Sequence, residues 1–416
     1  MNAPRLSKKR LLLFLAVVGP GLITANVDND AGGITTYSVA GAQFGYSILW
    51  TLIPITLLLI FVQEMCARMG AVTGKGLSDL IRENFGVKIT FFVMIGLLIA
   101  NFATTISEFA GIAAAGEIFG LSRLILVPLC AVIVLMLVLK FNYRSLEKIF
   151  LLMIAFYVSY IISGILANPD WSEVGRQFIT PTFQFSSAYI IVLVGVIGTT
   201  IAPWMQFYLQ SSIVEKGINA KDYKYSRIEV ILGCIMTDVV SFFIIMTCAA
   251  TLFTAGIAIN SASDAAIALE PLAGTFAKAL FALGLFGAGL FGAFILPVAT
   301  AFYVCEAFGW ESGLNKKLAE AKHFYVIIGA IIAASVGMIL LPGLPLIWIM
   351  LISQVVNGVV LPIILVAIVK IINNEQIMGE YVNNKIYNVV VIASTAVLIL
   401  LSGLLVVTTF FPQLFG

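Results

Sequence analysis

Charged side chains are scarce in this chain. Asp, Glu, Lys and Arg make up 11% of its 416 residues, whereas soluble domains contain about 25%, and the mean hydropathy is +1.08. Such a sequence does not supply enough polar side chains to cover a water-exposed surface, so a soluble globular protein is excluded. The net charge of +2 is also too small to favour a nucleic-acid partner.

Histidine and cysteine are rare as well. The one histidine, His323, falls at a predicted helix end, where a surface or interfacial position is expected. The five cysteines lie in or beside apolar runs without a CxxC pair, so they are interpreted as small buried residues: Cys66, Cys130, Cys234, Cys248 and Cys305. The glycine-rich stretch 70–76 has the wrong spacing for a phosphate loop and no Ser or Thr after Lys75. We therefore expect neither an enzyme nor a bound cofactor.

Long apolar runs fill the chain instead. A bilayer-spanning helix needs about 20 mostly apolar residues. Eleven such stretches lie near 11–41, 46–69, 89–118, 123–140, 146–167, 187–213, 228–254, 276–307, 324–342, 345–371 and 387–411. The connections are short, so the sequence predicts one all-α transmembrane domain over residues 1–416, surrounded by lipid. No obligate protein partner is evident, and a monomer is expected.

The basic residues predict how these helices are oriented. Cytoplasmic loops of membrane proteins are enriched in Lys and Arg. If the N-terminus is inside, only Arg123, Arg176 and Lys278 of the 23 Lys and Arg residues fall outside. The pattern therefore predicts a multi-pass protein of a prokaryotic inner (plasma) membrane. Its N-terminus is expected in the cytoplasm and, after eleven crossings, its C-terminus outside the cell.

The first apolar run is interrupted by a polar stretch. Residues 24–33 read TANVDNDAGG, which places Asp28, Asn29 and Asp30 beside a Gly pair inside one span. A carboxylate at membrane depth is costly unless it has a partner, and glycine permits local unwinding. The stretch is interpreted as a broken transmembrane helix with Asp30 at its substrate site; a short loop between two helices is the alternative.

A second interruption falls in the sixth run. Residues 198–204 read GTTIAPW, in which Pro203 removes a backbone hydrogen bond. A simple proline kink is the alternative to a break. Breaks in the first and sixth helices are typical of a five-plus-five inverted repeat with a central site. The repeats are predicted at 11–167 and 187–371, with an additional helix at 387–411.

Several motifs together resemble the NRAMP divalent-metal transporters over almost the full length. They are GAQFGY at 41–46, QEMCARMGAVTGK at 63–75, CEAFG at 305–309, and SQVV at 353–356 with Leu361-Pro362 downstream. The resemblance implies a LeuT-type fold and metal uptake. The branch most similar to this chain is that of the prokaryotic NRAMP-related magnesium transporters.

The resemblance also exposes departures at the metal site. The family's Asp-Pro-Gly-Asn motif corresponds to Asp30-Ala-Gly-Gly33, so its asparagine ligand is Gly33 here. Its Met-Pro-His motif corresponds to Ala202-Pro203-Trp204, so the soft methionine sulfur is absent. Oxygen ligands suit Mg²⁺, which dehydrates reluctantly and is often held by one or two carboxylates. A roomy site anchored by Asp30 is therefore predicted to take partly hydrated Mg²⁺, and Mn²⁺ as well.

Other intramembrane polar residues are candidates for the site or its pathway. Gln354 and Asn357 lie one turn apart on one helix face and are assigned to the ion or its water. Thr199 is assigned a backbone carbonyl at the second break. Roles in the pathway or in gating are assigned to four residues: Asp28, Asn29, Glu108 and Asp238. Asp238 is expected either to pair near Glu108 or to make a buried structural hydrogen bond.

Proton coupling in the family involves a helix 3 Asp–Glu pair, helix 6 histidines and basic residues in helix 9. Here Glu108 is kept, but the aspartate position is Thr105, helix 6 has no histidine, and 324–341 contains no Lys or Arg. A relay needs groups that titrate, so uncoupled entry driven by voltage and gradient is predicted. The alternatives are a proton-coupled Mn²⁺/Fe²⁺ symporter, a sodium-coupled amino-acid carrier on the same fold, and a membrane scaffold or sensor without flux.

Overall fold

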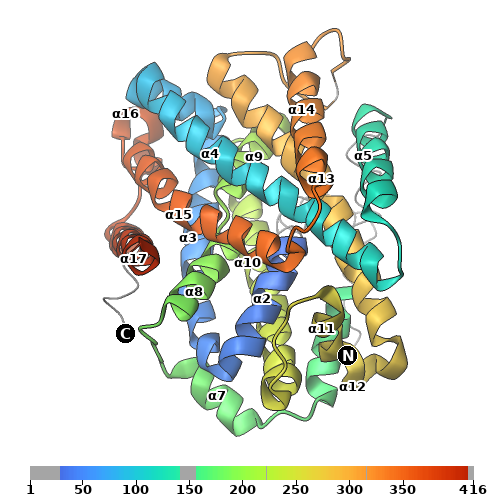
Figure 1. Cartoon of the computed structure of the whole chain (residues 1–416). Helices are drawn as coiled ribbons and strands as arrows, with labels where there is room; N and C mark the ends of the chain where they lie inside the picture. Colours follow the sequence, from blue (N-terminus) through green and yellow to red (C-terminus); the bar gives the residue numbers. More distant parts are fainter. Residues whose placement is uncertain (1–28, 141–155, 222, 315, 411–416) are drawn as a thin grey trace, which may run out of the picture.

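The structure is a computed structural model that describes residues 29–140, 156–221, 223–314 and 316–410 (Figure 1). Asp28 and residues 11–28 of the first predicted span lie outside the described residues. Helices make up nearly all of the described chain, and no strand occurs in these ranges. The predicted all-α class is therefore confirmed.

The helices follow the predicted apolar runs closely. The long ones are α2 (Ala31–Phe44), α3 (Leu52–Thr73), α4 (Leu77–Ile118), α5 (Arg123–Lys140), α8 (Ser187–Thr200), α9 (Pro203–Glu215), α10 (Tyr223–Cys248), α13 (Ala277–Phe308), α14 (Lys322–Ile339), α15 (Leu346–Ile372) and α17 (Lys385–Phe410). Eight helical stretches of the described residues are long and apolar enough to cross a bilayer, and Arg123–Leu139 and Phe156–Leu166 are shorter apolar helices.

Several short elements connect these helices. They are η1 (Gly45–Thr51), α7 (Trp171–Ile179), η2 (Ala249–Phe253), α11 (Ala262–Ala266), η3 (Ile267–Leu269), α12 (Glu270–Ala273), η4 (Gly274–Phe276), α16 (Glu375–Met378) and η5 (Gly379–Tyr381). Helix α7 lies between the predicted spans. Asp170 caps its first turn by accepting hydrogen bonds from the backbone N–H groups of Ser172 and Glu173.

Helix α4 differs from its predicted span. It begins at Leu77, well before the predicted start at residue 89, because helical backbone resumes directly after a bend at Gly86. Gly86 has φ 75° and ψ 170°, a conformation that glycine adopts without steric cost. The polar segment before Gly86, which was predicted as a connection between spans, is therefore helical.

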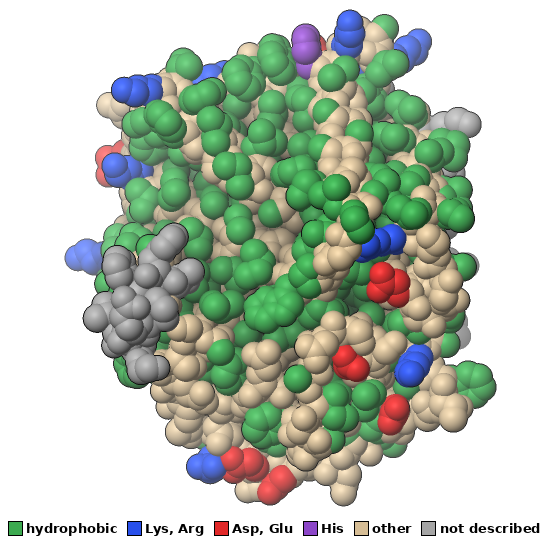
Figure 2. Space-filling model, in the orientation of Figure 1, with side chains coloured by type: hydrophobic (Ala, Val, Ile, Leu, Met, Phe, Trp, Pro, Cys, Tyr) green, Lys and Arg blue, Asp and Glu red, His purple; other side chains and the backbone are tan. Residues whose placement is uncertain are grey.

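The outer surface matches a lipid environment. Large apolar side chains point outward along several helices, among them Phe92, Ile125 and Leu400. Figure 2 shows hydrophobic side chains over the belt between the two ends, and Lys, Arg and the histidine along the end where α4 and α14 begin. His323 is exposed at this end and stacks on Trp310, with ring centroids 4.4 Å apart, as the sequence predicted. All five cysteines are free and buried, which confirms their interpretation.

The interior of the bundle is built around α2. This helix packs against α8, α10, α15 and α4, while α4 lies along α13 and α15. Glycines permit the closest approaches: a Cβ at Gly358 of α15 would lie 2.4 Å from the Val194 carbonyl oxygen of α8. Small residues at such crossings replace the hydrophobic driving force that is missing between helices in lipid.

The α8–α15 contact leads to a stability prediction. We expect Gly358→Ala to lower the apparent Tm in detergent by a few degrees or more, because overpacking costs about 1–3 kcal/mol and the clash is with backbone. The matched control is Gly337→Ala in α14, where an added Cβ meets nothing within 4 Å. Melting of Gly358→Ala at the wild-type temperature would show that the two helices are not packed this closely.

Candidate functional site

Asp30 lies at the beginning of α2, where its side chain caps the helix. Its Oδ1 accepts a hydrogen bond from the Gly33 backbone N–H at 2.6 Å, and its backbone is extended (φ −65°, ψ −177°). A carboxylate is favoured here because the first turn of a helix presents unpaired N–H groups and the positive end of the dipole. The helix thus starts inside the predicted span 11–41, as a break at Asp30 requires, and Asp30 is 3% exposed.

Glu108 brings a second carboxylate to the same helix end. Its Oε2 accepts from the Ala31 backbone N–H at 3.2 Å, and its carboxyl group lies within hydrogen-bonding reach of Asp30. Gly292 of α13 makes room for it, since a Cβ there would lie 2.3 Å from Glu108 Oε2. Among the described residues, no ion pair joins a Lys or Arg to either carboxylate.

Asn29 fastens the chain just before this pair. Its side chain donates to the Thr237 carbonyl at 3.5 Å and accepts from the Ser241 hydroxyl at 3.3 Å, both on α10. Its carbonyl accepts from the Tyr157 hydroxyl at 2.8 Å. Asn29 was predicted as a pathway or gating residue; the structure places it as an anchor that holds the non-helical backbone against α10 and the helix Phe156–Leu166.

The second predicted break is also present. Helix α8 ends at Thr200, Ile201 and Ala202 leave the helical conformation (φ −120°, ψ 51° and φ −60°, ψ 134°), and α9 starts at Pro203. Proline suits the first position of a helix, where its missing N–H is not needed. The interruption is therefore a complete break and not a proline kink. Thr200 joins this end to α2 through a 2.7 Å hydrogen bond with the Tyr37 hydroxyl.

Helix α15 contributes the predicted amides. A Cβ at Gly32 would lie 2.0 Å from Gln354 Nε2, so the Gln354 amide lies directly against the first turn of α2. Asn357 Nδ2 donates to Gln354 Oε1 and to Thr104 Oγ1, each at 2.9 Å, while its Oδ1 has no partner. The structure thus brings Gln354 to the carboxylate pair and holds Asn357 one turn away.

Asp238 belongs to α10 and faces Thr56 of α3, whose hydroxyl donates to the Leu52 carbonyl at 2.6 Å. Helix α10 packs on α3 and α2, whereas Glu108 faces Gly292 of α13. The predicted pairing near Glu108 and the buried structural hydrogen bond both stay predictions.

Two features of the site escaped the sequence analysis. The Met350 sulfur of α15 lies beside α2, where it accepts a hydrogen bond from the Thr35 hydroxyl at 3.4 Å. Ser107 of α4 also faces Gly32, since an added Cβ would lie 2.7 Å from its hydroxyl. Neither residue stands in a recognisable motif, and only the tertiary packing of α4 and α15 places them at the site.

The chemistry of this arrangement is that of an oxygen-rich cation site. The carboxyl groups of Asp30 and Glu108 and the Gln354 amide meet at the first turn of α2, and no Lys or Arg of the described residues pairs with the two acids. In the described part of the chain, no group of three or more His, Cys, Asp or Glu residues forms a chelating cluster. A cation held here would therefore have few protein ligands and would complete its shell with water.

Comparisons with known proteins agree with this geometry. The sequence model of the Nramp family, described as natural resistance-associated macrophage protein-like, matches residues 21–408. The divalent metal cation transporter MntH of Caldanaerobacter subterraneus subsp. tengcongensis is 26% identical over 412 residues, which cover 95% of this chain and 94% of that protein.

Solved structures show the same fold. A manganese transporter of Eremococcus coleocola, in complex with an aromatic bis-isothiourea compound, superposes with a TM-score of 0.79 at 20% identity, covering 99% of this chain and 90% of the other. Mhp1, a nucleobase-cation-symport-1 family transporter, superposes with a TM-score of 0.58 at 13% identity, covering 95% and 92%. The fold is thus the LeuT-type fold implied by the sequence resemblance. Because the family model spans nearly the whole chain, this protein belongs to the Nramp family of divalent-metal transporters, which are not enzymes.

Proposed function

We propose that this transporter carries Mg²⁺, and Mn²⁺ as a second ion, into the cell without proton coupling. The ion is held in partly hydrated form by Asp30, between the start of α2 and the α8–α9 break. The observation that carries the proposal is the buried Asp30–Glu108 pair, which has no Lys or Arg partner among the described residues. Two adjacent buried carboxylates repel one another, and a divalent cation relieves that repulsion.

The residues proposed around the ion favour a hard, hydrated cation. Asn357 supplies its amide oxygen, which has no partner, and Thr199 supplies a backbone carbonyl at the end of α8. Gln354 contacts the water of the ion through its amide, since its Oε1 accepts from Asn357 Nδ2 at 2.9 Å. Gly33 and Ala202 supply no side-chain ligand and leave space. Mg²⁺ demands near-octahedral oxygen coordination at about 2.0–2.1 Å and usually keeps several waters, so small residues at two ligand positions suit it.

The Met350 sulfur beside α2 is already engaged. Met350 Sδ accepts a hydrogen bond from the Thr35 hydroxyl at 3.4 Å. On its other side lies Gly111 of α4, where an added Cβ would be 3.6 Å from the sulfur. A thioether would have to give up this contact to bind a soft metal. The position before α9 where the family carries methionine is Ala202, so no sulfur is contributed from that side.

Few titratable groups lead away from the carboxylate pair. Thr105, at the position of the family's aspartate, donates a hydrogen bond from its hydroxyl to the Asn101 carbonyl at 2.8 Å. Helix α9 contains no histidine, and Trp204 takes the position of the family's histidine. In α14, Lys322 and His323 stand only at the exposed first turn. The inside-negative potential supplies the driving force instead, at about 2.3 kcal/mol per charge per 100 mV and twice that for a divalent ion.

Manganese remains the second candidate, in a proton-coupled symporter. The relative from Caldanaerobacter is a divalent metal cation transporter, and the Eremococcus protein is a manganese transporter. Glu108 is retained beside Asp30. An amino-acid carrier is disfavoured because the Ala31 and Gly33 N–H groups already donate to the protein's own carboxylates, which would repel a substrate carboxylate.

The orientation and organisation of the chain are part of the same proposal. The end that carries Arg68, Lys75 and Arg82 is placed in the cytoplasm by the positive-inside rule. The N-terminus then lies in the cytoplasm and the C-terminus outside the cell. We propose a monomer built from inverted repeats at 11–167 and 187–371, with α17 as the additional helix.

Asp30→Ala tests the site directly. At subsaturating Mg²⁺, uptake into proteoliposomes should fall by roughly 100-fold to several thousand-fold, because losing one partner of a buried charge contact costs about 3–5 kcal/mol. Internal Mg²⁺ is followed with a fluorescent indicator. Glu117→Ala, an exposed acid at the end of α4, is the control and should transport as wild type. Full uptake by Asp30→Ala would refute the assignment.

Ala202→Met tests the ligand argument. A thioether at this position should raise the ratio of Cd²⁺ or Mn²⁺ uptake to Mg²⁺ uptake by roughly tenfold, which corresponds to about 1.4 kcal/mol. Ala202→Leu adds similar volume without sulfur and separates ligation from crowding. If Met and Leu reduce the transport of all three metals equally, residue 202 does not face the ion.

A further inference from the structure

A second buried carboxylate lies at the basic end of the bundle, away from Asp30. Glu306 belongs to the last turns of α13 and accepts a hydrogen bond from the Ser211 hydroxyl of α9, Oγ to Oε1, at 2.5 Å. Its other oxygen, Oε2, is inaccessible to solvent and accepts no hydrogen bond in the described structure. A buried carboxylate oxygen without a donor is rare and calls for a water or a cation.

Gln210 supplies a second unpaired oxygen at the same place. Its Nε2 donates to the Lys75 carbonyl at 2.9 Å, while its Oε1 has no partner and the residue is fully buried. A Cβ at Gly76 would lie 2.2 Å from Glu306 Oε2. Gln210 and Glu306 therefore both meet the Lys75–Gly76 segment, which brings together side chains of α9 and α13 and a backbone carbonyl of the α3–α4 connection.

The nearby basic side chains do not neutralise Glu306. Lys75 Nζ pairs with Glu83 at 2.7 Å, and Arg82 pairs with Asp79 at 3.0 Å. Arg82 also donates to the backbone carbonyls of Glu306 and Ala307, at 2.9 and 3.1 Å, but not to the carboxylate. The cluster thus gathers oxygen acceptors, and among the described residues no Lys or Arg pairs with the Glu306 carboxyl group.

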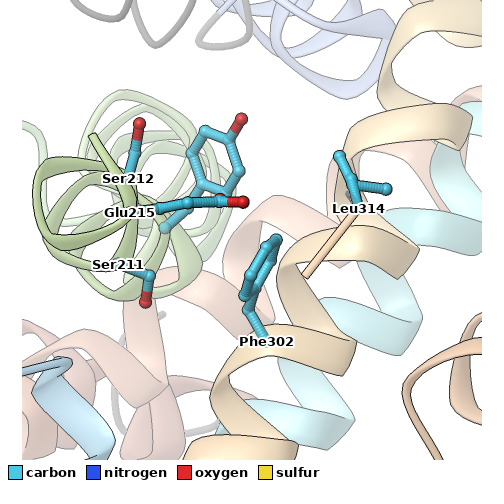
Figure 3. A pocket seen from close by; sticks show the side chains of 6 residues that line it. Ser211, Ser212, Glu215, Phe302 and Leu314 are labelled. Carbon is cyan, nitrogen blue, oxygen red and sulfur yellow. The ribbon is translucent and has the colours of Figure 1, made fainter. Parts of the chain in front are cut away.

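A pocket at the same end gives solvent a way to Ser211. It lies between α9 and α13 and is lined by Tyr208, Ser211, Ser212, Glu215, Phe302 and Leu314 (Figure 3). Ser211 belongs both to this pocket and to the Glu306 contact. Lys75 is exposed on the other side of the cluster. The pocket and the exposed Lys75 therefore place the cluster one residue, Ser211, from the surface of this end, on the proposed cytoplasmic side.

We propose that Glu306, Gln210, Ser211 and the Lys75 carbonyl form a second divalent-cation site at the release end of the transporter. One carboxylate with neutral oxygens and water is a coordination set typical of Mg²⁺ and Mn²⁺. Gln210 follows Ala202 by eight positions, about 12 Å along α9 at 1.5 Å per residue, so the two sites are separate. The inference rests on the proposed function only for the identity of the ion.

Equilibrium binding of Mn²⁺ to the purified full-length protein in detergent tests this site. With Asp30→Ala, one saturable Mn²⁺ site should remain. Adding Glu306→Gln should weaken that residual binding at least tenfold, whereas adding Glu117→Gln, at the exposed far end of α4, should leave it unchanged. Loss of all saturable binding in Asp30→Ala, or its persistence in Asp30→Ala/Glu306→Gln, would overturn the proposal.

A further variant guards against a folding artefact. Gly76→Ala removes no ligand but places a methyl group against Glu306 Oε2, so in the Asp30→Ala background it should also weaken Mn²⁺ binding tenfold or more. The metal-free Tm of each variant is recorded alongside. Unchanged binding in folded Gly76→Ala would contradict the proposed location. Mg²⁺ uptake by Asp30→Ala alone would instead contradict the transport site, so the two failures are distinguishable.

Discussion

The contact between Asp30 and Glu108 at the first turn of α2 imposes the main constraint on this fold. Two acidic side chains share the interior of a membrane protein, where each charge is costly. The N–H groups of Ala31 and Gly33 offset part of that cost. In the proposed function a divalent cation offsets the remainder, because the described structure supplies no basic side chain to the pair. The start of α2 at Ala31 is what makes those backbone donors available.

The surrounding helices keep this helix end in place. Asn29 and Tyr157 hold the chain before α2 against α10, and Gly32 allows Gln354 to approach from α15. Gly292 of α13 gives Glu108 its space. At the second break, Ala202 and Pro203 interrupt the helix, so backbone groups there lack the i to i−4 hydrogen bonds of a continuous helix. Glycine and small residues thus serve both close packing and the opening of the site.

Hydropathy and local chemistry predicted most of the architecture. Apolar runs located the helices, Pro203 located the break between α8 and α9, and Asp30 beside glycines located the start of α2. Sequence could not show that Glu108 meets Asp30, or that Asp238 faces Thr56 of α3, since both depend on which helices pack together. It also left Glu306 without a role, although its motif was recognised. Metal coordination by these residues stays a prediction. The inverted repeat also stays a prediction, because its first helix falls largely within residues 11–28, outside the described residues.

The central claim is that a hydrated divalent ion moves down its own electrochemical gradient. It is tested most directly by recording internal Mg²⁺ and internal pH together in proteoliposomes under an imposed inside-negative potassium diffusion potential. The account predicts that Mg²⁺ entry rises with the potential while internal pH stays constant. Acidification in step with Mg²⁺ entry, lost in Glu108→Gln, would contradict it.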